Sequence, residues 1–144
     1  MNAVRDLTVR LMFPRDLKHI LAIEEKRPGS WSRENFTPVF RWGNTTGWVA
    51  EIGDVIVGHL VFSSGPQGLT LLNVAVAPYW RRQGIARTML QKLDEKHPAR
   101  IEATVPESNL TAQMLLRNAG YKAVRVLRDQ FGGEDGYVME RRPG

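Results

Sequence analysis

The stretch LLNVAVAPYWRRQGIA, residues 71–86, decides the fold of this chain. Its first half is an apolar run typical of a buried strand, and Pro78 ends that strand because proline cannot donate to a sheet ladder. Gly84 then turns the chain into a segment whose apolar residues recur at helical spacing. A strand, a glycine turn and a helix start in this order bring main-chain N–H groups and the positive end of a helix together. The stretch therefore predicts a site for the phosphate groups of a cofactor.

A simpler interpretation of the same residues is that Arg81 and Arg82 are solvated and that Gly84 only turns the chain. The order of the features favours the phosphate site, because a buried strand, a strand stop and an amphipathic helix all flank the turn. The apolar face of that helix would comprise Ile85, Ala86, Met89, Leu90 and Leu93.

This pattern resembles the pyrophosphate loop of the GNAT superfamily of acyl-CoA-dependent N-acyltransferases. The family pattern, Arg/Gln-x-x-Gly-x-Gly/Ala, falls here on Arg81, Gly84 and Ala86. Residues 108–115 and 120–121 resemble the second cofactor segment of the family. Residues 31–36 and 134–139 resemble the branch that acetylates the N-terminal alanine of a ribosomal protein, so the resemblance covers nearly the whole chain.

The resemblance implies acetyl-CoA as the cofactor and no metal. The main chain of Val74 and Val76 would hold the pantetheine arm, with the Val76 N–H directed at the thioester oxygen. Asn109 would contact the cofactor near its pantetheine in addition to capping a helix. The phosphate loop would comprise Arg81, Arg82, Gln83, Gly84, Ile85, Ala86 and Arg87.

The chain departs from the resembling branch at both proton-transfer positions. Thr104 stands where the branch has a glutamate base, and Leu116 stands where the family has its usual tyrosine, seven residues after Asn109. Glu102 lies two residues before Thr104 on the same strand face, so we predict it as a base that acts through water. Its carboxylate could equally have a structural role at a strand end. A thiolate leaves with little protonic help, because the pKa of a thiol is ~8.5.

A weak base favours an α-amine as the acceptor. An α-amine, with a pKa of ~7.7–8.0, is neutral far more often at neutral pH than a lysine with a pKa of ~10.4. We therefore predict acetyl transfer to a protein or peptide N-terminus, and a small-molecule amine of low pKa would serve equally. The residues are also compatible with a non-catalytic acyl-CoA-binding or regulatory domain, and with an acetyltransferase that acts on aminoacyl-tRNA.

The composition predicts one N-acetyltransferase domain over residues 1–144, with an ordinary hydrophobic content of 42%. The chain has no cysteine, which excludes disulfides and a cysteine acyl-enzyme, so transfer would be direct. We expect a cytoplasmic protein, because no signal-like or membrane-length apolar run is present. The net charge of +5 is spread along the sequence, so nucleic acid binding is possible but not favoured.

The remaining periodicity predicts a mixed α/β fold, with one central sheet of six to seven strands flanked by about four helices. The first helix carries Leu17, Ile20, Leu21 and Glu24 at helical spacing. His59 is left out of the site, because a lone histidine in a strand is more often structural. Trp31 is predicted to be a packing anchor, and residues 31–36 to shape the acceptor groove. Strands are expected at 7–12, 48–52, 55–63, 69–76, 101–105, 121–127 and 137–141, and helices at 14–26, after Ser32, at 85–97 and at about 110–118.

Overall fold

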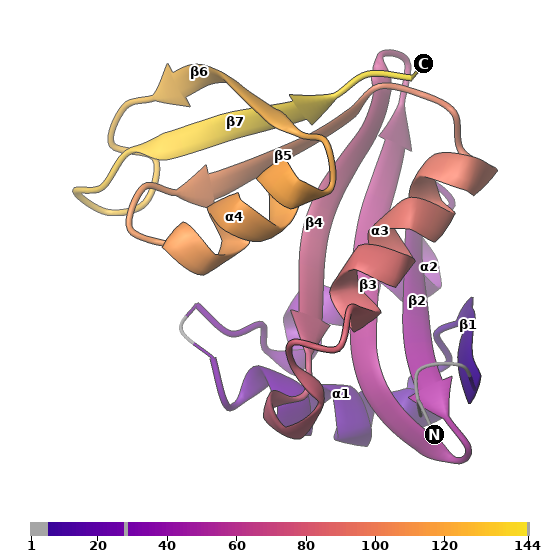
Figure 1. Ribbon diagram of the computed structural model, residues 1–144. Helices are drawn as coiled ribbons and strands as arrows, with labels where there is room; N and C mark the ends of the chain where they lie inside the picture. Colours follow the sequence, from indigo (N-terminus) through magenta and orange to yellow (C-terminus); the bar gives the residue numbers. More distant parts are fainter. Residues whose placement is uncertain (1–5, 28, 144) are drawn as a thin grey trace.

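The computed structural model describes residues 6–27 and 29–143. They form a seven-stranded mixed sheet in the order β1-β2-β3-β4-β5-β7-β6, with helices on both faces (Figure 1). The strands are β1 (Leu7–Leu11), β2 (Thr45–Ile52), β3 (Val55–Gly65), β4 (Gly68–Val76), β5 (Ile101–Pro106), β6 (Lys122–Leu127) and β7 (Gly136–Arg141). The helices are α1 (Leu17–Glu24), α2 (Thr37–Arg41), α3 (Ile85–Lys96) and α4 (Leu110–Asn118), joined by the short 3-10 turns η2 (Pro14–Asp16), η3 (Arg33–Phe36) and η4 (Pro78–Trp80). The predicted fold class is confirmed.

The two faces of the sheet carry separate hydrophobic clusters. Helices α3 and α4 cover the front face in Figure 1, and α1 and α2 lie behind the sheet. The larger cluster includes Ile85, Met89 and Leu93 of α3, each at most 1% exposed. The smaller cluster joins Leu17 and Ile20 of α1 to the other face. In the described part of the chain, no helix is long and apolar enough to cross a membrane.

Some element boundaries differ from the predicted ones. The helix expected from residue 14 to 26 is a 3-10 turn followed by α1, because Asp16 accepts the N–H of Phe13 at 2.8 Å and holds the first turn tight. The short helix after Ser32 is a 3-10 turn that continues into α2. Strand β2 begins three residues early, since Thr45 pairs with Ser63 of β3. The predicted hairpin of the second and third strands is confirmed, and β3 lies inside the sheet.

Strands β4 and β5 are parallel neighbours that pair over only two residues. Leu69 pairs with Ile101 and Thr70 with Glu102, and beyond these pairs no ladder joins the two strands. Figure 1 shows β4 continuing away while β5, β7 and β6 fan out to the side. The edge of β4 that follows Thr70 is therefore left without a strand partner on this side.

Helix α3 packs close to β3 because Gly58 offers no side chain. A Cβ atom at Gly58 would lie 2.9 Å from the carbonyl oxygen of Ala75 and 3.2 Å from the terminal carbon of Met89. The first separation is one that real Cβ atoms essentially never show, and the second would require Met89 to shift, so glycine at this position allows both β4 and α3 to approach β3 closely.

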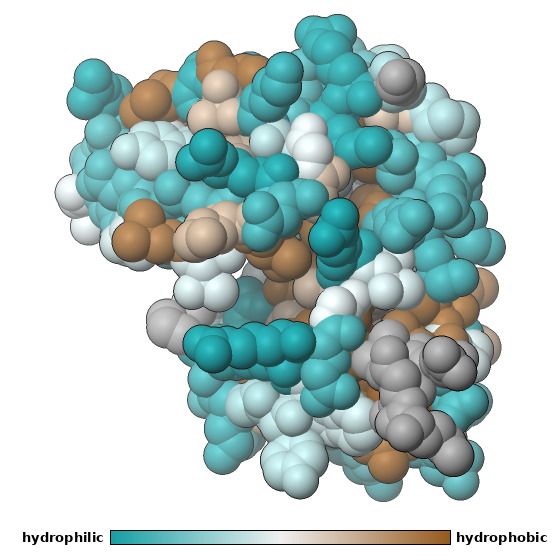
Figure 2. Space-filling model, in the orientation of Figure 1, coloured by the Kyte–Doolittle hydropathy of each residue, from teal (hydrophilic) through white to brown (hydrophobic). Residues whose placement is uncertain are grey.

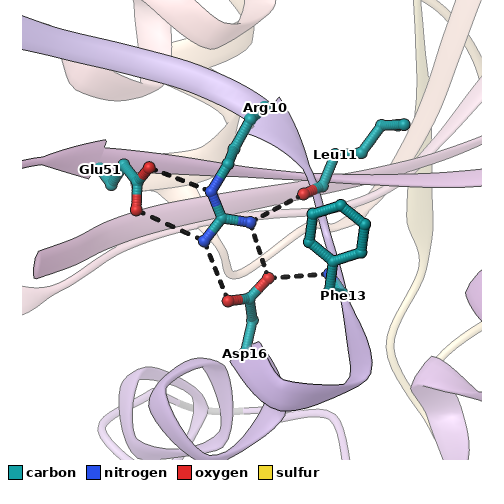
Figure 3. A network of polar contacts seen from close by, with 5 residues as sticks. All are labelled: Arg10, Leu11, Phe13, Asp16 and Glu51. Carbon is teal, nitrogen blue, oxygen red and sulfur yellow. Dashed lines mark hydrogen bonds and ion pairs between the residues drawn. The ribbon is translucent and has the colours of Figure 1, made fainter. Parts of the chain in front are cut away.

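Figure 3 shows a polar network that joins β1, β2 and the start of α1. The Arg10 guanidinium donates to both carboxylate oxygens of Asp16, at 2.9 and 3.0 Å, and to Glu51 at 3.0 Å. Asp16 is only 3% exposed, so its charge needs these donors. The guanidinium fork therefore ties the edge of the sheet to the first turn of α1.

The substitution Asp16→Asn tests this network. The hydrogen bond from Arg10, against the opposing effect of burial, lowers the pKa of Asp16 below 3.8. Such a carboxyl group stabilises the fold above its ordinary pKa, and the stabilisation is lost as the pH falls through the folded-state value. We expect Asp16→Asn to lower the free energy of unfolding by about 1–3 kcal/mol at pH 7, and by much less in strong acid, both measured by urea denaturation. Asp54→Asn, in the exposed β2–β3 turn, is the control, and equal losses in the two variants would contradict the assignment.

Candidate active site

The turn before α3 has the backbone conformation of an anion-binding loop. Gly84 is the N-cap of α3 with φ of 81°, and Arg82 also has a positive φ, 64°. Left-handed residues alternating with others turn successive N–H groups toward one point, and the first N–H groups of a helix have no acceptor within the helix. A Cβ at Gly84 would meet nothing within 4 Å, so the space beside this turn is open. The turn can therefore receive a phosphate group.

The side chains predicted for this loop divide into two kinds. Arg81, Arg82, Gln83 and Arg87 are exposed, and Ile85 is 1% exposed in the core. Ile85 can thus contribute only its main chain to a ligand, and Ala86 is half-buried. The positive φ of Arg82 did not follow from the sequence, since a non-glycine residue rarely adopts it and such strain is typical of functional turns.

The unpaired edge of β4 leads from this turn into the molecule. The carbonyl of Val76 accepts the Nε of Arg81 at 3.3 Å, and the carbonyl of Val74 accepts the Nη1 of Arg27 at 3.0 Å. The N–H and C=O of a strand residue point to the same edge, so the N–H groups of Val74 and Val76 face the gap beside β4. Figure 2 shows the surface hollowed between the part that holds α4 and the part that holds α1. The structure therefore brings the predicted edge and the predicted loop together.

Asn109 begins α4 on the far side of this gap. Its side chain accepts the N–H of Ala112 at 3.1 Å, as an N-cap residue does. The capping role is confirmed, and contact with a cofactor stays a prediction. Gly120 ends the helix in the left-handed conformation that the sequence indicated, with φ of 96°.

Glu102 lies at the closed end of the gap, where β4 and β5 still pair. Its carboxylate forms ion pairs with Arg100 and, at 3.6 Å, with Arg125. Its strand partner Thr70 is four residues from Val74, which is roughly 13 Å along β4. These contacts favour the structural role of Glu102, and its role as a base stays a prediction.

A buried polar cluster that the sequence analysis did not assign lies behind β4. Glu24, His59 and Asn73 are 1%, 0% and 4% exposed. One carboxylate oxygen of Glu24, Oε2, lies 2.6 Å from the Nε2 of His59 and 3.5 Å from the Nδ2 of Asn73, and the other accepts the Trp31 N–H at 2.8 Å. The Nη1 of Arg27 is 3.7 Å from Oε2. The cluster thus links α1, β3, β4 and the segment of Trp31.

The charge on Glu24 is maintained by its partners. Burial raises the pKa of this carboxyl group, but hydrogen bonds from His59 and the Trp31 N–H lower it further than burial raises it, and the pKa lies below its ordinary value. The Nδ1 of His59 and the Oδ1 of Asn73 have no hydrogen-bond partner among the described residues. Buried polar atoms in this state are typical of sites that also hold water or a ligand.

The sequence did contain a signal for this cluster. Glu24 falls on the apolar face of α1, Asn73 interrupts an apolar strand, and His59 interrupts the neighbouring strand. Each residue alone is ordinary, and only the packing of α1 on β3 and β4 shows that the three meet. Trp31 is the packing anchor that was predicted, with its ring 5.0 Å from the ring of Phe36 in an edge-to-face contact.

Comparison with known families identifies the class of protein. The acetyltransferase (GNAT) family matches residues 17–121, which include the turn at Gly84 and the strands β4 and β5. The chain therefore belongs to this family, and the predicted enzyme class, an acyl-CoA N-acyltransferase, is confirmed. No curated protein matches the sequence.

Solved structures share the fold at low sequence identity. The ribosomal-protein-S18-alanine N-acetyltransferase from Escherichia coli has a TM-score of 0.81 and 22% identity, over 94% of this chain and 92% of that one. A spermidine N-acetyltransferase chimera from Vibrio cholerae and hSSAT has a TM-score of 0.80 and 18% identity, over 95% of each chain. Arabidopsis thaliana NAA60, in complex with a bisubstrate analogue, has a TM-score of 0.77 and 19% identity, over 93% of this chain and 96% of that one.

The substitution Glu102→Gln separates the two roles of Glu102. The carboxylate of Glu102 is held by Arg100 and Arg125 at the closed end of the gap. We therefore expect Glu102→Gln to lower the rate of acyl transfer no more than the substitution of another carboxylate that pairs with Arg100. Glu140, which accepts the Nε of Arg100 at 2.6 Å, gives that control as Glu140→Gln. Turnover and its pH profile are measured for both variants. A fall in kcat of about tenfold or more in Glu102→Gln alone, with acetyl-CoA affinity unchanged, would support the base and contradict the structural role.

Proposed function

We propose that this protein is an acetyl-CoA-dependent N-acetyltransferase that transfers acetyl to an α-amino group, most readily that of a protein or peptide N-terminus. The observation that carries the proposal is that the left-handed turn at Gly84 closely follows the edge of β4, which has no strand partner on the β5 side after Thr70. A small amine of low pKa is the alternative acceptor. A cytoplasmic location stays a prediction.

The phosphate groups of coenzyme A have a suitable site at the turn. Main-chain N–H groups of residues 82–86, the positive end of α3 and the exposed side chains of Arg81, Arg82 and Arg87 all favour negative charge there. The pantetheine arm would then extend along β4 and bond to the main chain of Val74 and Val76. Asn109 would contact the arm from the opposite side of the gap.

The reaction needs few groups from the protein. The acceptor nitrogen uses its lone pair to bond to the carbonyl carbon of the thioester, the C–S bond breaks, and the proton that the nitrogen loses ends on the thiol of coenzyme A. A main-chain N–H on β4 would stabilise the carbonyl oxygen as it becomes negative. Neither Thr104 nor Leu116 can supply a proton acceptor or a phenol, so an acceptor that is already neutral is favoured.

The substitution Gly84→Asp tests the cofactor site. An aspartate would place a negative charge where a phosphate must approach the backbone, and we expect acetyl-CoA affinity to fall by at least about a hundredfold. Isothermal titration calorimetry with acetyl-CoA measures the loss. Gly53→Asp is the matched control, because Gly53 also has a positive φ, 60°, and no atom within 4 Å of its Cβ position, yet lies in the β2–β3 turn. Undiminished affinity in Gly84→Asp would refute the proposed site.

A thiol-release assay tests the acceptor. With acetyl-CoA in excess, we expect turnover of peptides with a free N-terminal amine and little turnover of the same peptides when the terminus is blocked and only a lysine is free. Cofactor binding without turnover of any amine would instead favour a non-catalytic acyl-CoA-binding domain. Salt-sensitive binding of aminoacyl-tRNA, with acetylation of its α-amine, would favour an RNA-directed acetyltransferase.

A further inference from the structure

Arg27 is a cation placed at the unpaired edge of β4. Its Nη1 donates to the carbonyl of Val74 and is 3.7 Å from the Oε2 of Glu24, and its side chain is 24% exposed. A guanidinium group has five N–H donors, and among the described residues the hydrogen bond to Val74 is the one that the guanidinium of Arg27 makes. Several donors of this group thus remain available at the edge where the proposed thioester would lie.

The buried cluster explains why Arg27 is held there. Glu24 is 1% exposed and cannot move toward solvent without losing its contacts with His59 and the Trp31 N–H. A buried carboxylate attracts the nearest cation strongly, because the surrounding dielectric is low. Glu24 on one side and the Val74 carbonyl on the other therefore fix the guanidinium against β4. The guanidinium group of Arg27 is therefore held at the edge of β4 that an acceptor would approach.

An α-amino group carries a neighbouring oxygen that suits the guanidinium group of Arg27. In a peptide N-terminus, the amine and a carbonyl oxygen are attached to adjacent carbon atoms, so an oxygen accompanies the attacking nitrogen into the site. A guanidinium group donates well to such an oxygen. A polyamine carries a second ammonium group instead, which the guanidinium repels. A nearby cation also favours the neutral form of an amine, which is the form that attacks.

We propose that Arg27 is a specificity-determining residue, which donates to the carbonyl or carboxylate oxygen beside the acceptor amine and so selects α-amines over simple alkylamines and polyamines. This inference rests on the proposed function. It assigns the distinction between acceptor classes to one side chain on the loop after α1. The chain has Thr104 and Leu116 in place of the glutamate and the tyrosine expected from the resemblance.

The test compares three acceptors at saturating acetyl-CoA. Alaninamide has the oxygen beside its amine, a fluorinated ethylamine has an amine of similar pKa but no carbonyl, and spermidine is a polycation. The kcat/KM for each is measured for the wild type, for Arg27→Met and for Lys26→Met. Lys26 is the neighbouring exposed cation, so Lys26→Met removes the same charge from the same segment and leaves the hydrogen bond from Arg27 to Val74 in place. Circular dichroism and acetyl-CoA calorimetry check that each variant is folded and binds the cofactor.

We expect the wild type to prefer alaninamide over the fluorinated amine by at least about tenfold, as one hydrogen bond to a charged group provides. In Arg27→Met this ratio should approach one, mainly through a higher KM for alaninamide, and relative activity on spermidine should rise. Lys26→Met should keep the wild-type ratio. Arg27→Gln, whose neutral amide ends two bonds short of the position of Nη1, is the second variant should Arg27→Met fail to fold, and the same loss of preference is expected.

The failures of the two proposals are distinguishable. If the wild type turns over alaninamide and the ratio is unchanged in the folded Arg27 variants, the inference about Arg27 is overturned and the proposed function stands. If the wild type binds acetyl-CoA but acetylates no amine, the proposed function is overturned and the inference falls with it.

Discussion

The separation of β4 from β5 after two residue pairs is the constraint on which the rest of the site depends. Main-chain N–H and C=O groups inside a protein need partners, and a central strand that loses its neighbour exposes a row of them. In this chain two of the carbonyls, at Val74 and Val76, are taken by arginine side chains from different segments. The N–H groups of the same residues are left toward the gap, so the edge proposed to bind the cofactor is produced by the break in the sheet.

Two parts of this edge are held in place by different interactions. After Val76, a short 3-10 turn and the left-handed turn at Gly84 begin α3, so a helix N-terminus closely follows the edge of β4. Beside Asn73 and Val74, within the edge, electrostatics dominates: the buried carboxylate of Glu24 is bound by His59 and the Trp31 N–H and attracts Arg27. The turn proposed to bind an anion and the charged side chains of Glu24 and Arg27 therefore lie along the same strand.

The fold was largely predictable from local patterns. Apolar runs, helical spacing and glycine or proline punctuation indicated the number and order of the elements, because these signals act within a few residues of the chain. Boundaries at β2 and α1 were less accurate, since pairing of Thr45 with Ser63 and the carboxylate of Asp16 decided them. The left-handed turn at Gly84 was predictable for the same reason as the fold, because a strand stop, a glycine and a helix start follow one another in the chain. The left-handed Arg82 was not, because that conformation depends on how the turn is held between β4 and α3.

The class of this protein, an α/β acyltransferase, could be inferred from the sequence alone, because the relevant pattern lies in contiguous residues such as 71–86. Only the tertiary structure decided which charged residues face the gap. It placed Glu102 at the closed end among arginines, and it brought Glu24, Arg27, His59 and Asn73, from three separate segments, behind and beside Val74. Burial and ion pairing between distant residues depend on packing, and no local pattern in a sequence records them.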